Sequence, residues 1–362
     1  MPSEENKYKI ALCDLGHSFR GGQRQTLNLA RTLQYNAHEI VVICHRNGEL
    51  LKHCELNGIE TIPSRYRILN LPSEGYRLSK ELKRIGTEIF HASDSHGHTL
   101  GLIVKKFHSS LKMVVTVRTA FDKSTSLSKR VKYNSPKVDA YAAISKAVFD
   151  ILLKKGVAPS KIKVIPSSVD YGVFNSSCRT KSDVFRIGTA GALEQGKGVD
   201  LILLALAGIN DKLGDYVFKV AGEGPYRDSL ELQAGKLGFN RRIEFLGFVN
   251  DMPDFYCNLD LFILASKSEG LGSSMLEAGA CGAVVAGTAI PAIQEIISDN
   301  KNGFLFERHD LGRLSNIILG LSRDNELRNK IRKEFYNNLR KFDINNITGQ
   351  YLKLYRKLLE NN

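Results

Sequence analysis

The alternation of short apolar runs with helix-length amphipathic stretches constrains the fold of this 362-residue chain more than any other feature. Because buried parallel strands form continuous apolar runs joined by helical crossovers, the alternation predicts parallel α/β layers. The runs lie at residues 8–13, 39–44, 88–91, 113–117, 140–144 and 162–165, and then at 185–190, 216–221, 243–246, 261–265 and 283–286. We therefore expect two Rossmann-like domains.

The two series are separated by residues 175–182, which are polar and without periodicity, as in a linker. We expect an N-terminal domain at residues 1–170 and a C-terminal domain at residues 171–344. After Leu311 the pattern is helical, with helices ending near Leu321, Arg340 and Leu359. The last segment, residues 345–362, is basic like the first half, which favours packing near the N-terminal domain.

The net charge of +13 is unevenly distributed. Residues 1–181 carry +14, residues 182–320 carry −6 and residues 321–362 carry +5. This division indicates two domains with different partners, and an anionic one for the basic half. The basic residues that we single out for such contact are Lys105, Lys106, Lys123, Lys129, Arg130, Lys132, Lys154 and Lys155.

Other features restrict the location and the chemistry. The six cysteines include no C-x-x-C pair, so neither a disulfide framework nor a zinc ribbon is expected. The N-terminus lacks the apolar core of a signal peptide, and no window approaches the roughly 18 apolar residues of a membrane span. These observations predict a cytoplasmic protein, with peripheral contact to the cytoplasmic face of a membrane left open.

The strongest candidate site is the segment 268–278, S-E-G-L-G-S-S-M-L-E-A, directly after an apolar run. Its glycines allow backbone amides to approach a ligand, Ser273 or Ser274 can cap the following helix, and a helix N-terminus binds phosphate. Glu269 and Glu277 would flank a diphosphate. The alternative is that Glu269 is a solvated turn residue and Glu277 a surface residue of the helix.

Three further strand-to-helix loops belong to the same half. Residues 191–198 are glycine-rich and carry Lys197, whose charge can stabilise a departing diphosphate, although it could also be an ordinary residue at a helix start. Residues 221–227 include Glu223 and Gly224, and residues 245–249 include Phe248. Loops of this kind converge on the carboxyl ends of the strands. None matches G-x-G-x-x-G or a P-loop, which disfavours NAD binding and P-loop chemistry.

In their order and spacing, these loops resemble the donor domain of glycosyltransferase family 4, which has the GT-B fold of two Rossmann-like domains with parallel sheets facing across a cleft. The likeness extends to Gly21 and Gly22 in the first strand-to-helix loop, to residues 91–98 and to residues 164–170. Residues 118–133 also resemble the corresponding stretch of family members that act on lipopolysaccharide core and other envelope glycans.

The resemblance implies a retaining enzyme that takes a sugar from a nucleotide diphosphate sugar and works without a metal or other cofactor. Glu269 and Lys197 would act at the reacting centre. The implied donor-binding residues are Gly21, Gly22, Gly191, Lys197, Glu223, Gly224, Phe248, Glu269, Gly270, Leu271, Gly272, Ser273 and Glu277. The chain departs from the family pattern at Ala192, where an arginine is frequent, at Arg118, where a histidine is frequent, and at residues 288–295, which lack paired glycines.

The histidines His91, His96 and His98, with Asp94, leave three interpretations open. They can hold a metal, cap the start of a helix, or contact the acceptor or donor together with Arg118. The spacing disfavours the metal, because residues two apart on a helix point in different directions.

These features predict a glycosyltransferase that uses a UDP- or GDP-sugar and a hydroxyl of an envelope glycan or glycolipid as acceptor. Nucleic acid is disfavoured, because no binding module accompanies the positive charge. Two alternatives stay open: a nucleotide-sugar epimerase of the same fold, and a non-catalytic protein that binds sugar nucleotides.

Overall fold

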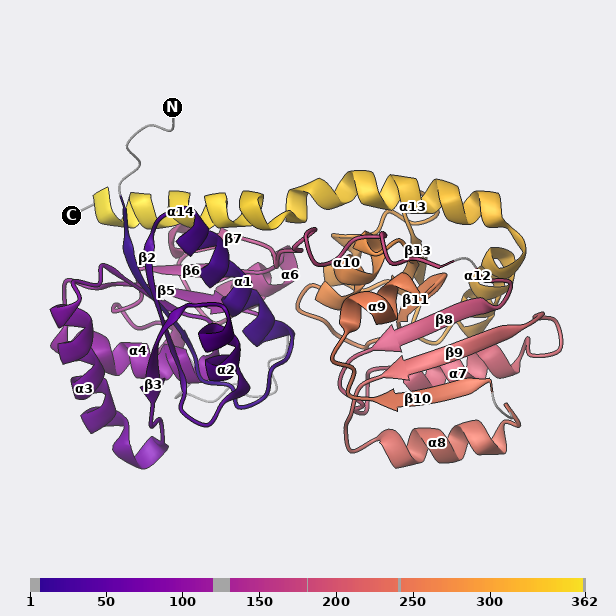
Figure 1. Ribbon diagram of the computed structural model, residues 1–362, viewed down its shortest axis with the longest axis horizontal. Helices are drawn as coiled ribbons and strands as arrows, with labels where there is room; N and C mark the ends of the chain where they lie inside the picture. Colours follow the sequence, from indigo (N-terminus) through magenta and orange to yellow (C-terminus); the bar gives the residue numbers. More distant parts are fainter. Residues whose placement is uncertain (1–6, 120–130, 181, 240–241, 361–362) are drawn as a thin grey trace. The chain divides into compact units, whose positions relative to one another are not determined.

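The computed structural model describes residues 7–119, 131–180, 182–239 and 242–360 (Figure 1). It divides into two compact units. One comprises Met1–Ser168 with Ile344–Asn362, and the other comprises Val169–Asp343. Both boundaries lie within two residues of those expected from the sequence. Below, the two units are described separately.

The N-terminal unit is built on a seven-stranded parallel sheet with the order β3-β2-β1-β4-β5-β6-β7. Its strands are β1 (Lys9–Asp14), β2 (Glu39–His45), β3 (Glu60–Ser64), β4 (Ile89–Ala92), β5 (Lys112–Val117), β6 (Ala140–Ala143) and β7 (Ile162–Val164). Its helical segments include α1 (Gly21–Tyr35), α2 (Glu49–Leu56), η1 (Ile68–Asn70), α3 (Leu71–Arg84), α4 (Ser95–Phe107), α6 (Lys146–Lys154), η2 (Pro159–Lys161) and α14 (Ile344–Glu360). Order and direction are those of a Rossmann-like domain.

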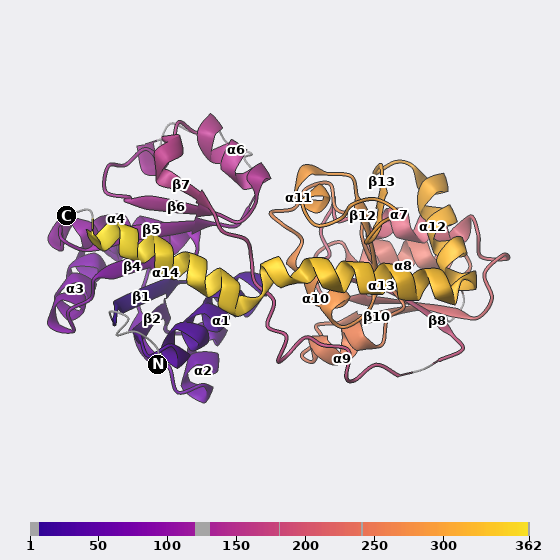
Figure 2. The same cartoon turned by 90° about the horizontal axis from the view of Figure 1, so that it is seen from above.

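The C-terminal helix α14 completes the core of this unit. Ile347, Tyr351 and Tyr355 are buried against residues of β1, β2 and α1, and Figure 2 shows α14 lying over the sheet. The hydroxyl of Tyr355 bonds to Nδ1 of His91 at 2.7 Å. The side chain of Thr116 then links Nε2 of His91, at 2.6 Å, to the Tyr351 hydroxyl, at 3.1 Å. The last helix is thus part of the N-terminal unit in packing as well as in charge.

The C-terminal unit is built on a six-stranded parallel sheet with the order β10-β9-β8-β11-β12-β13. Its strands are β8 (Phe185–Ala190), β9 (Tyr216–Ala221), β10 (Ile243–Gly247), β11 (Leu261–Leu264), β12 (Val284–Thr288) and β13 (Phe304–Phe306). Its helices include α7 (Val199–Ala207), α8 (Arg227–Lys236), α9 (Met252–Cys257), α10 (Ser273–Ala280), α11 (Pro291–Gln294), α12 (Leu311–Arg323), α13 (Asn325–Leu339) and η3 (Arg340–Phe342).

A cluster of arginines around Asp260 fixes the start of this unit to its sheet and to α13. The carboxylate of Asp260 accepts bonds from Arg179 at 2.5 Å and Arg332 at 3.3 Å. Arg186, in β8, lies 3.5 Å from the same carboxylate. Burial and the neighbouring Arg179 charge lower the pKa of Arg332 to about 10. One buried carboxylate therefore joins three elements that are distant in sequence.

The sequence indicated no disulfide framework, but the structure contains one disulfide among the described residues. Cys178, in the segment before β8, forms a disulfide with Cys257 at the end of α9. The two residues are 79 positions apart and neither belongs to a C-x-x-C motif, so their spacing gave no signal. Cys13, Cys44, Cys54 and Cys281 are buried and free, as small apolar residues would be.

Within the described residues, none of the helices combines the length and the apolar character needed to cross a membrane.

Candidate active site

The glycine-rich loops of the C-terminal unit lie at the carboxyl ends of its strands. Strands β8 and β11 are neighbours, but the chain leaves β8 towards β9 on the other side, so a topological switch point lies between them. Ligands of open α/β sheets bind outside the carboxyl ends of the strands at such a point. The loop from Gly191 to Gly198 follows β8, and the loop from Ala265 to Gly272 follows β11.

Glycines allow these loops to pack backbone against backbone. A Cβ on Gly198 would lie 2.1 Å from the carbonyl oxygen of Ala265, and one on Gly222 would lie 1.8 Å from that of Gly191. Both glycines have positive φ, at +78° and +137°. Gly224 is restricted by close approach alone, because a Cβ there would lie 2.2 Å from the Leu193 oxygen. The glycine pattern is therefore dictated by close approach of three loops.

Lys197 and Glu269 come together across the switch point. Nζ of Lys197 lies 2.7 Å from Oε1 of Glu269, and both side chains are partly buried. The two loops are also joined by a backbone bond of 2.7 Å from the Lys267 amide to the Gly196 oxygen. A cation and a carboxylate are thus held side by side where the switch point predicts a ligand.

Helix α10 begins beside this pair, but with a different cap from the one expected. Its N-cap is Gly272, with φ of +91°, and no side chain caps it; Ser273 is the first helical residue instead. The first amides of a helix have no partner within it and attract anions. The absence of a serine cap leaves these amides to a ligand.

Glu277 lies one turn into α10 and is buried, so it is not the surface residue of the alternative interpretation. Gly270 and Leu271 connect Glu269 to the helix, and the Leu271 side chain packs in the core. Glu269 is not simply a solvated turn residue either, because it is paired with Lys197.

The third and fourth loops supply more exposed groups. The carboxylate of Glu223 accepts a bond of 2.8 Å from Arg227, which also bonds to Glu231. Phe248, just after β10, is 62% exposed. A Cβ on Gly247 would lie 2.6 Å from the Glu223 carboxylate, so these two loops are also in contact.

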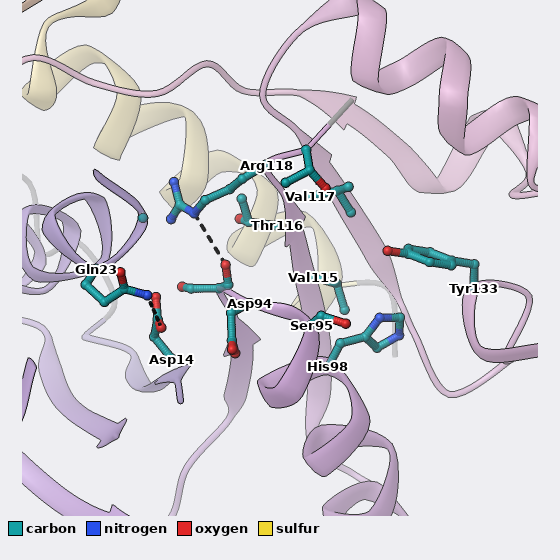
Figure 3. Close-up of a pocket in the computed structure, with 13 residues that line it drawn as sticks. Asp14, Gln23, Asp94, Ser95, His98, Val115, Thr116, Val117, Arg118 and Tyr133 are labelled. Atoms are coloured by element: carbon teal, nitrogen blue, oxygen red, sulfur yellow. Dashed lines mark hydrogen bonds between the residues drawn. The ribbon is translucent and has the colours of Figure 1, made fainter. Parts of the chain in front are cut away.

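The N-terminal unit has a pocket of about 330 Å³ at its own switch point, between β1 and β4 (Figure 3). Its polar lining residues include Asp14, Gln23, Ser93, Asp94, Ser95, His98, Thr116, Arg118 and Tyr133. Nε of Arg118 donates to the Ser93 carbonyl at 3.3 Å, which holds the arginine across the pocket. The pocket therefore offers both signs of charge to one ligand.

The two carboxylates of the pocket are held differently. Asp14 accepts bonds from the Gln23 amide at 2.8 Å and the Thr26 hydroxyl at 3.0 Å. Asp94 is the N-cap of α4 and accepts from the amide of Gly97 at 2.7 Å. Burial, and then the charge of Asp14, raise the pKa of Asp94. The helix cap is thus Asp94 and not one of the neighbouring histidines.

Two buried polar atoms in the pocket wall have no bonding partner among the residues that the structure describes: Oγ of Ser93 and Nε2 of His98. Burial, aided by the charge of Lys132, lowers the pKa of His98 to about 3, so this ring is neutral at physiological pH. Buried polar atoms usually have a partner, and one left without is costly. Each atom is therefore a candidate for a hydrogen bond to a bound ligand.

The other two histidines lie elsewhere. His91 is fully buried, and both ring nitrogens are bonded, to Tyr355 and Thr116. This burial disagrees with the expectation that His91 contacts the acceptor, because the ring lies behind the pocket wall. Nδ1 of His96 lies 3.0 Å from the Tyr66 hydroxyl. Among the described residues, no group of histidine, cysteine and carboxylate side chains is arranged to hold a metal.

The sequence pattern placed Gly21 and Gly22 in a loop. In the structure they instead form the first turn of α1, after the N-cap Arg20. Gly22 lines the pocket, and a Cβ added to it would approach Cδ of Arg118 at 3.8 Å. Gly21 faces open space, since a Cβ there would meet nothing within 4 Å. Both are thus at a helix N-terminus beside the pocket.

Comparison with known protein families agrees with this architecture. The family model described as Glycosyltransferase Family 4 matches residues 19–172, and the model Glycosyl transferases group 1 matches residues 177–338. The matches fall on the two Rossmann-like units in turn. The chain belongs to glycosyltransferase family 4. It is therefore a glycosyltransferase with the GT-B fold.

Two relatives of this family 4 glycosyltransferase are named for steps in the synthesis of lipid-linked or lipopolysaccharide glycans. The chain is 26% identical to an Escherichia coli UDP-Gal:alpha-D-GlcNAc-diphosphoundecaprenol alpha-1,3-galactosyltransferase, with 92% of this chain and 95% of the relative covered. It is 29% identical to the lipopolysaccharide core biosynthesis glycosyltransferase LpsE of Rhizobium meliloti, over 48% of this chain and 51% of the relative.

Solved structures share the fold. A glycosyltransferase from Rickettsia africae has a TM-score of 0.85 at 21% identity, with 99% of this chain and 100% of that chain covered. Anabaena Alr3699/HepE, solved in complex with UDP-glucose, has a TM-score of 0.85 at 20% identity, with 96% and 99% covered.

Sequence reasoning missed several pocket residues of this family 4 enzyme. Asp14 and Tyr133 were not singled out, and Asp94 was considered only beside the histidines. A signal was present for the two aspartates, because Asp14 directly follows the apolar run 8–13 and Asp94 lies two residues after the end of β4, and both runs become central strands. Tyr133 is brought to the pocket by contact with His98, at 5.3 Å between ring centroids, and no local pattern indicated it.

Proposed function

We propose that this protein is a retaining glycosyltransferase that moves a sugar from a nucleotide diphosphate sugar, UDP- or GDP-linked, to a hydroxyl of a cell-envelope glycan or glycolipid such as lipopolysaccharide core. The observation that carries the proposal is the Lys197–Glu269 pair at the β8–β11 switch point, beside the uncapped start of α10. A cation and a set of free amides suit a diphosphate. A carboxylate next to them suits the hydroxyls of the attached sugar.

In the proposed reaction, the acceptor oxygen bonds to the anomeric carbon on the face from which the diphosphate leaves. The bond from that carbon to the phosphate oxygen breaks, and the proton of the acceptor hydroxyl passes to the leaving phosphate. Lys197 and the amides of Leu271 to Ser273 stabilise the charge that develops there. No protein base and no resident cofactor are required by this scheme. Glu277 would bind the ribose.

The acceptor class is supported by the relatives and by the N-terminal pocket. One relative is named for a diphosphoundecaprenol-linked acceptor and another for lipopolysaccharide core. In the pocket, Arg118 can meet an anionic group, while Ser93 and His98 have unpaired atoms for hydroxyls. We therefore propose an acceptor with both phosphate and hydroxyl groups, used on the cytoplasmic face of a membrane.

The donor is first identified by a thermal-shift screen of UDP- and GDP-sugars, compared with ADP and CMP compounds. The test is then the rate of sugar transfer by the variants Lys197→Ala and Glu269→Ala. Each variant should lower kcat by about 100-fold or more, as loss of a group that stabilises the transition state does. The matched control is Lys219→Ala, which removes another lysine–glutamate pair of the same sheet, at 3.7 Å from Glu244. Wild-type rates in both site variants would refute the assignment.

Two other candidates are separated by the same assays. A nucleotide-sugar epimerase would isomerise the donor when no acceptor is present, and a transferase would not. A non-catalytic binding protein, suggested by Ala192 in place of a second cation, would give a thermal shift with a sugar nucleotide but no turnover, including slow hydrolysis.

A further inference from the structure

Two large apolar side chains project from the N-terminal unit at the short helix η1. Leu69 is 98% exposed and Ile68 is 78% exposed. The turn that carries them is ordered by its own hydrogen bonds: Asn70 accepts from the Arg67 amide at 2.8 Å and donates to the Arg65 carbonyl at 2.9 Å. Ile68 and Leu69 are therefore exposed on a turn whose shape is fixed by hydrogen bonds within it.

The adjoining helices carry two more exposed apolar side chains. Tyr76, in α3, and Phe107, at the end of α4, are both exposed, and their ring centroids lie 5.3 Å apart. Nζ of Lys80 lies 4.6 Å from the centre of the Tyr76 ring. Figures 1 and 2 both show α3 beside α4. We call the surface formed by Ile68, Leu69, Tyr76, Phe107, Lys80, Lys83 and Lys106 the α3–α4 face.

Among the described residues, the charges of the α3–α4 face for which no carboxylate partner is found are basic. Lys80, Lys83 and Lys106 are exposed, and so is Arg67 in the turn. The two carboxylates of α3, Glu74 and Glu81, are both bonded to Arg77, at 2.8 Å and 2.9 Å. A surface of exposed apolar tips among unneutralised lysines matches the interface of an anionic bilayer, which takes up the apolar groups and attracts the cations.

Several of the basic residues singled out from the sequence do not belong to this face. Lys105 is paired with Asp139, and Lys132 donates to the Ser95 carbonyl at 2.6 Å. Lys123, Lys129 and Arg130 lie outside the described residues. Lys106 is the member of that set that belongs to the α3–α4 face.

We propose that the α3–α4 face docks this protein on an anionic lipid bilayer. The proposal rests on the proposed function, which requires access to a glycolipid. The face is connected to the pocket: the hydroxyl of Tyr66, two residues before Ile68, lies 3.0 Å from His96, in the first turn of α4. Ser95 and His98 on either side of His96 line the pocket. The α3–α4 face and the pocket are therefore joined through the first turn of α4.

The test is sedimentation of the full-length protein with vesicles of phosphatidylcholine alone or mixed with phosphatidylglycerol. Wild type should bind the mixed vesicles and not the neutral ones. Ile68→Ser with Leu69→Ser should weaken binding about tenfold, since the apolar contact is lost. Lys80→Glu with Lys83→Glu should weaken it by more than fivefold per lysine and reduce its salt dependence, given the attraction of each basic residue to such a surface.

The matched control is Tyr35→Ser with Leu56→Ser, because these side chains are 89% and 84% exposed but lie at the ends of α1 and α2. The control should bind as wild type does. No binding of wild type to mixed vesicles, or equal losses in control and test variants, would overturn the proposal. So would self-association of wild type that Ile68→Ser with Leu69→Ser abolishes, since the face would then cover a second copy.

Vesicle binding is measured without donor or acceptor, so this result is independent of catalysis. Protein that binds vesicles but transfers no sugar would refute the proposed function and leave the docking surface standing. Protein that transfers sugar to a water-soluble acceptor but binds no vesicles would do the reverse.

Discussion

Asp94 combines two roles with opposite effects on stability. As the N-cap of α4 it bonds to the Gly97 amide, which stabilises the helix. As a partly buried carboxyl close to Asp14 it carries a charge that the fold disfavours, and its pKa is raised. The native state therefore holds this proton to higher pH than the unfolded chain does. It follows that the contribution of Asp94 to the free energy of unfolding falls as pH rises through that interval.

The variant Asp94→Asn tests this balance, because the amide oxygen can still cap the helix but carries no charge. Its melting temperature should exceed that of wild type near neutral pH, and the gap should narrow as pH falls towards the ordinary range of a carboxyl group. Asp94→Ala, which loses the cap, should be about 1 kcal/mol less stable than Asp94→Asn. A pH-independent gap between Asp94→Asn and wild type would contradict the assigned cause.

Single residues also mark what the sequence could and could not indicate. Lys197, Glu269 and Glu277 follow recognisable turns, and the structure brings the first two together and buries the third. The burial of His91 could not be foreseen, because it depends on α14, which is more than 250 residues away in sequence. Contacts of such separation leave no trace in local patterns.

At the scale of elements, the apolar runs predicted all the interior strands of both sheets and two of the edge strands, β7 and β10. The eleven apolar runs correspond to strands β1, β2 and β4–β12, with ends that differ by one or two residues. The strands β3 and β13 were missed. Both are edge strands, and β3 contains Pro63, which is tolerated at an edge and weakens a strand pattern.

The loops between elements give a prediction on Gly222. An added Cβ would overlap the Gly191 oxygen at 1.8 Å, and this contact is with backbone that no rotamer change can relieve. Gly222→Ala should therefore separate the loops after β8 and β9, lower the thermal midpoint and abolish the thermal shift produced by a sugar nucleotide. The measurements are circular dichroism melting and the thermal shift with the donor identified in the screen.

A glycine in the adjacent helix provides the control. Gly235, in α8, has no atom within 4 Å of an added Cβ and an ordinary helical φ. Gly235→Ala should leave donor binding intact and raise stability by about 0.5 to 1 kcal/mol, as such changes do in helices. If Gly222→Ala behaved like Gly235→Ala, the close packing of the loops would not be what fixes their shape.

For the molecule as a whole, the distribution of charge follows the division into two folded units. The excess positive charge belongs to one folded unit, because α14 packs in the N-terminal core: residues 1–168 with 344–362 carry +15, and residues 169–343 carry −2. The mildly acidic middle segment lies in the other unit, which carries the glycine-rich loops after β8 and β11. The sequence therefore indicated the division of the molecule, while the bonds that fix α14 had to be seen in the structure.

The N-terminal unit is discontinuous in sequence, which predicts an asymmetric response to truncation. Removing residues 344–362 would expose apolar residues of β1, β2 and α1 that α14 covers, and would leave His91 without Tyr355. The N-terminal unit should then lose its cooperative unfolding transition, while the unit Val169–Asp343 keeps its own. Tyr355→Phe should have a graded effect, destabilising the N-terminal unit by about 1 to 3 kcal/mol through the unpaired His91 nitrogen. Calorimetry resolves the two transitions, and equal loss of both would show that the units do not fold separately.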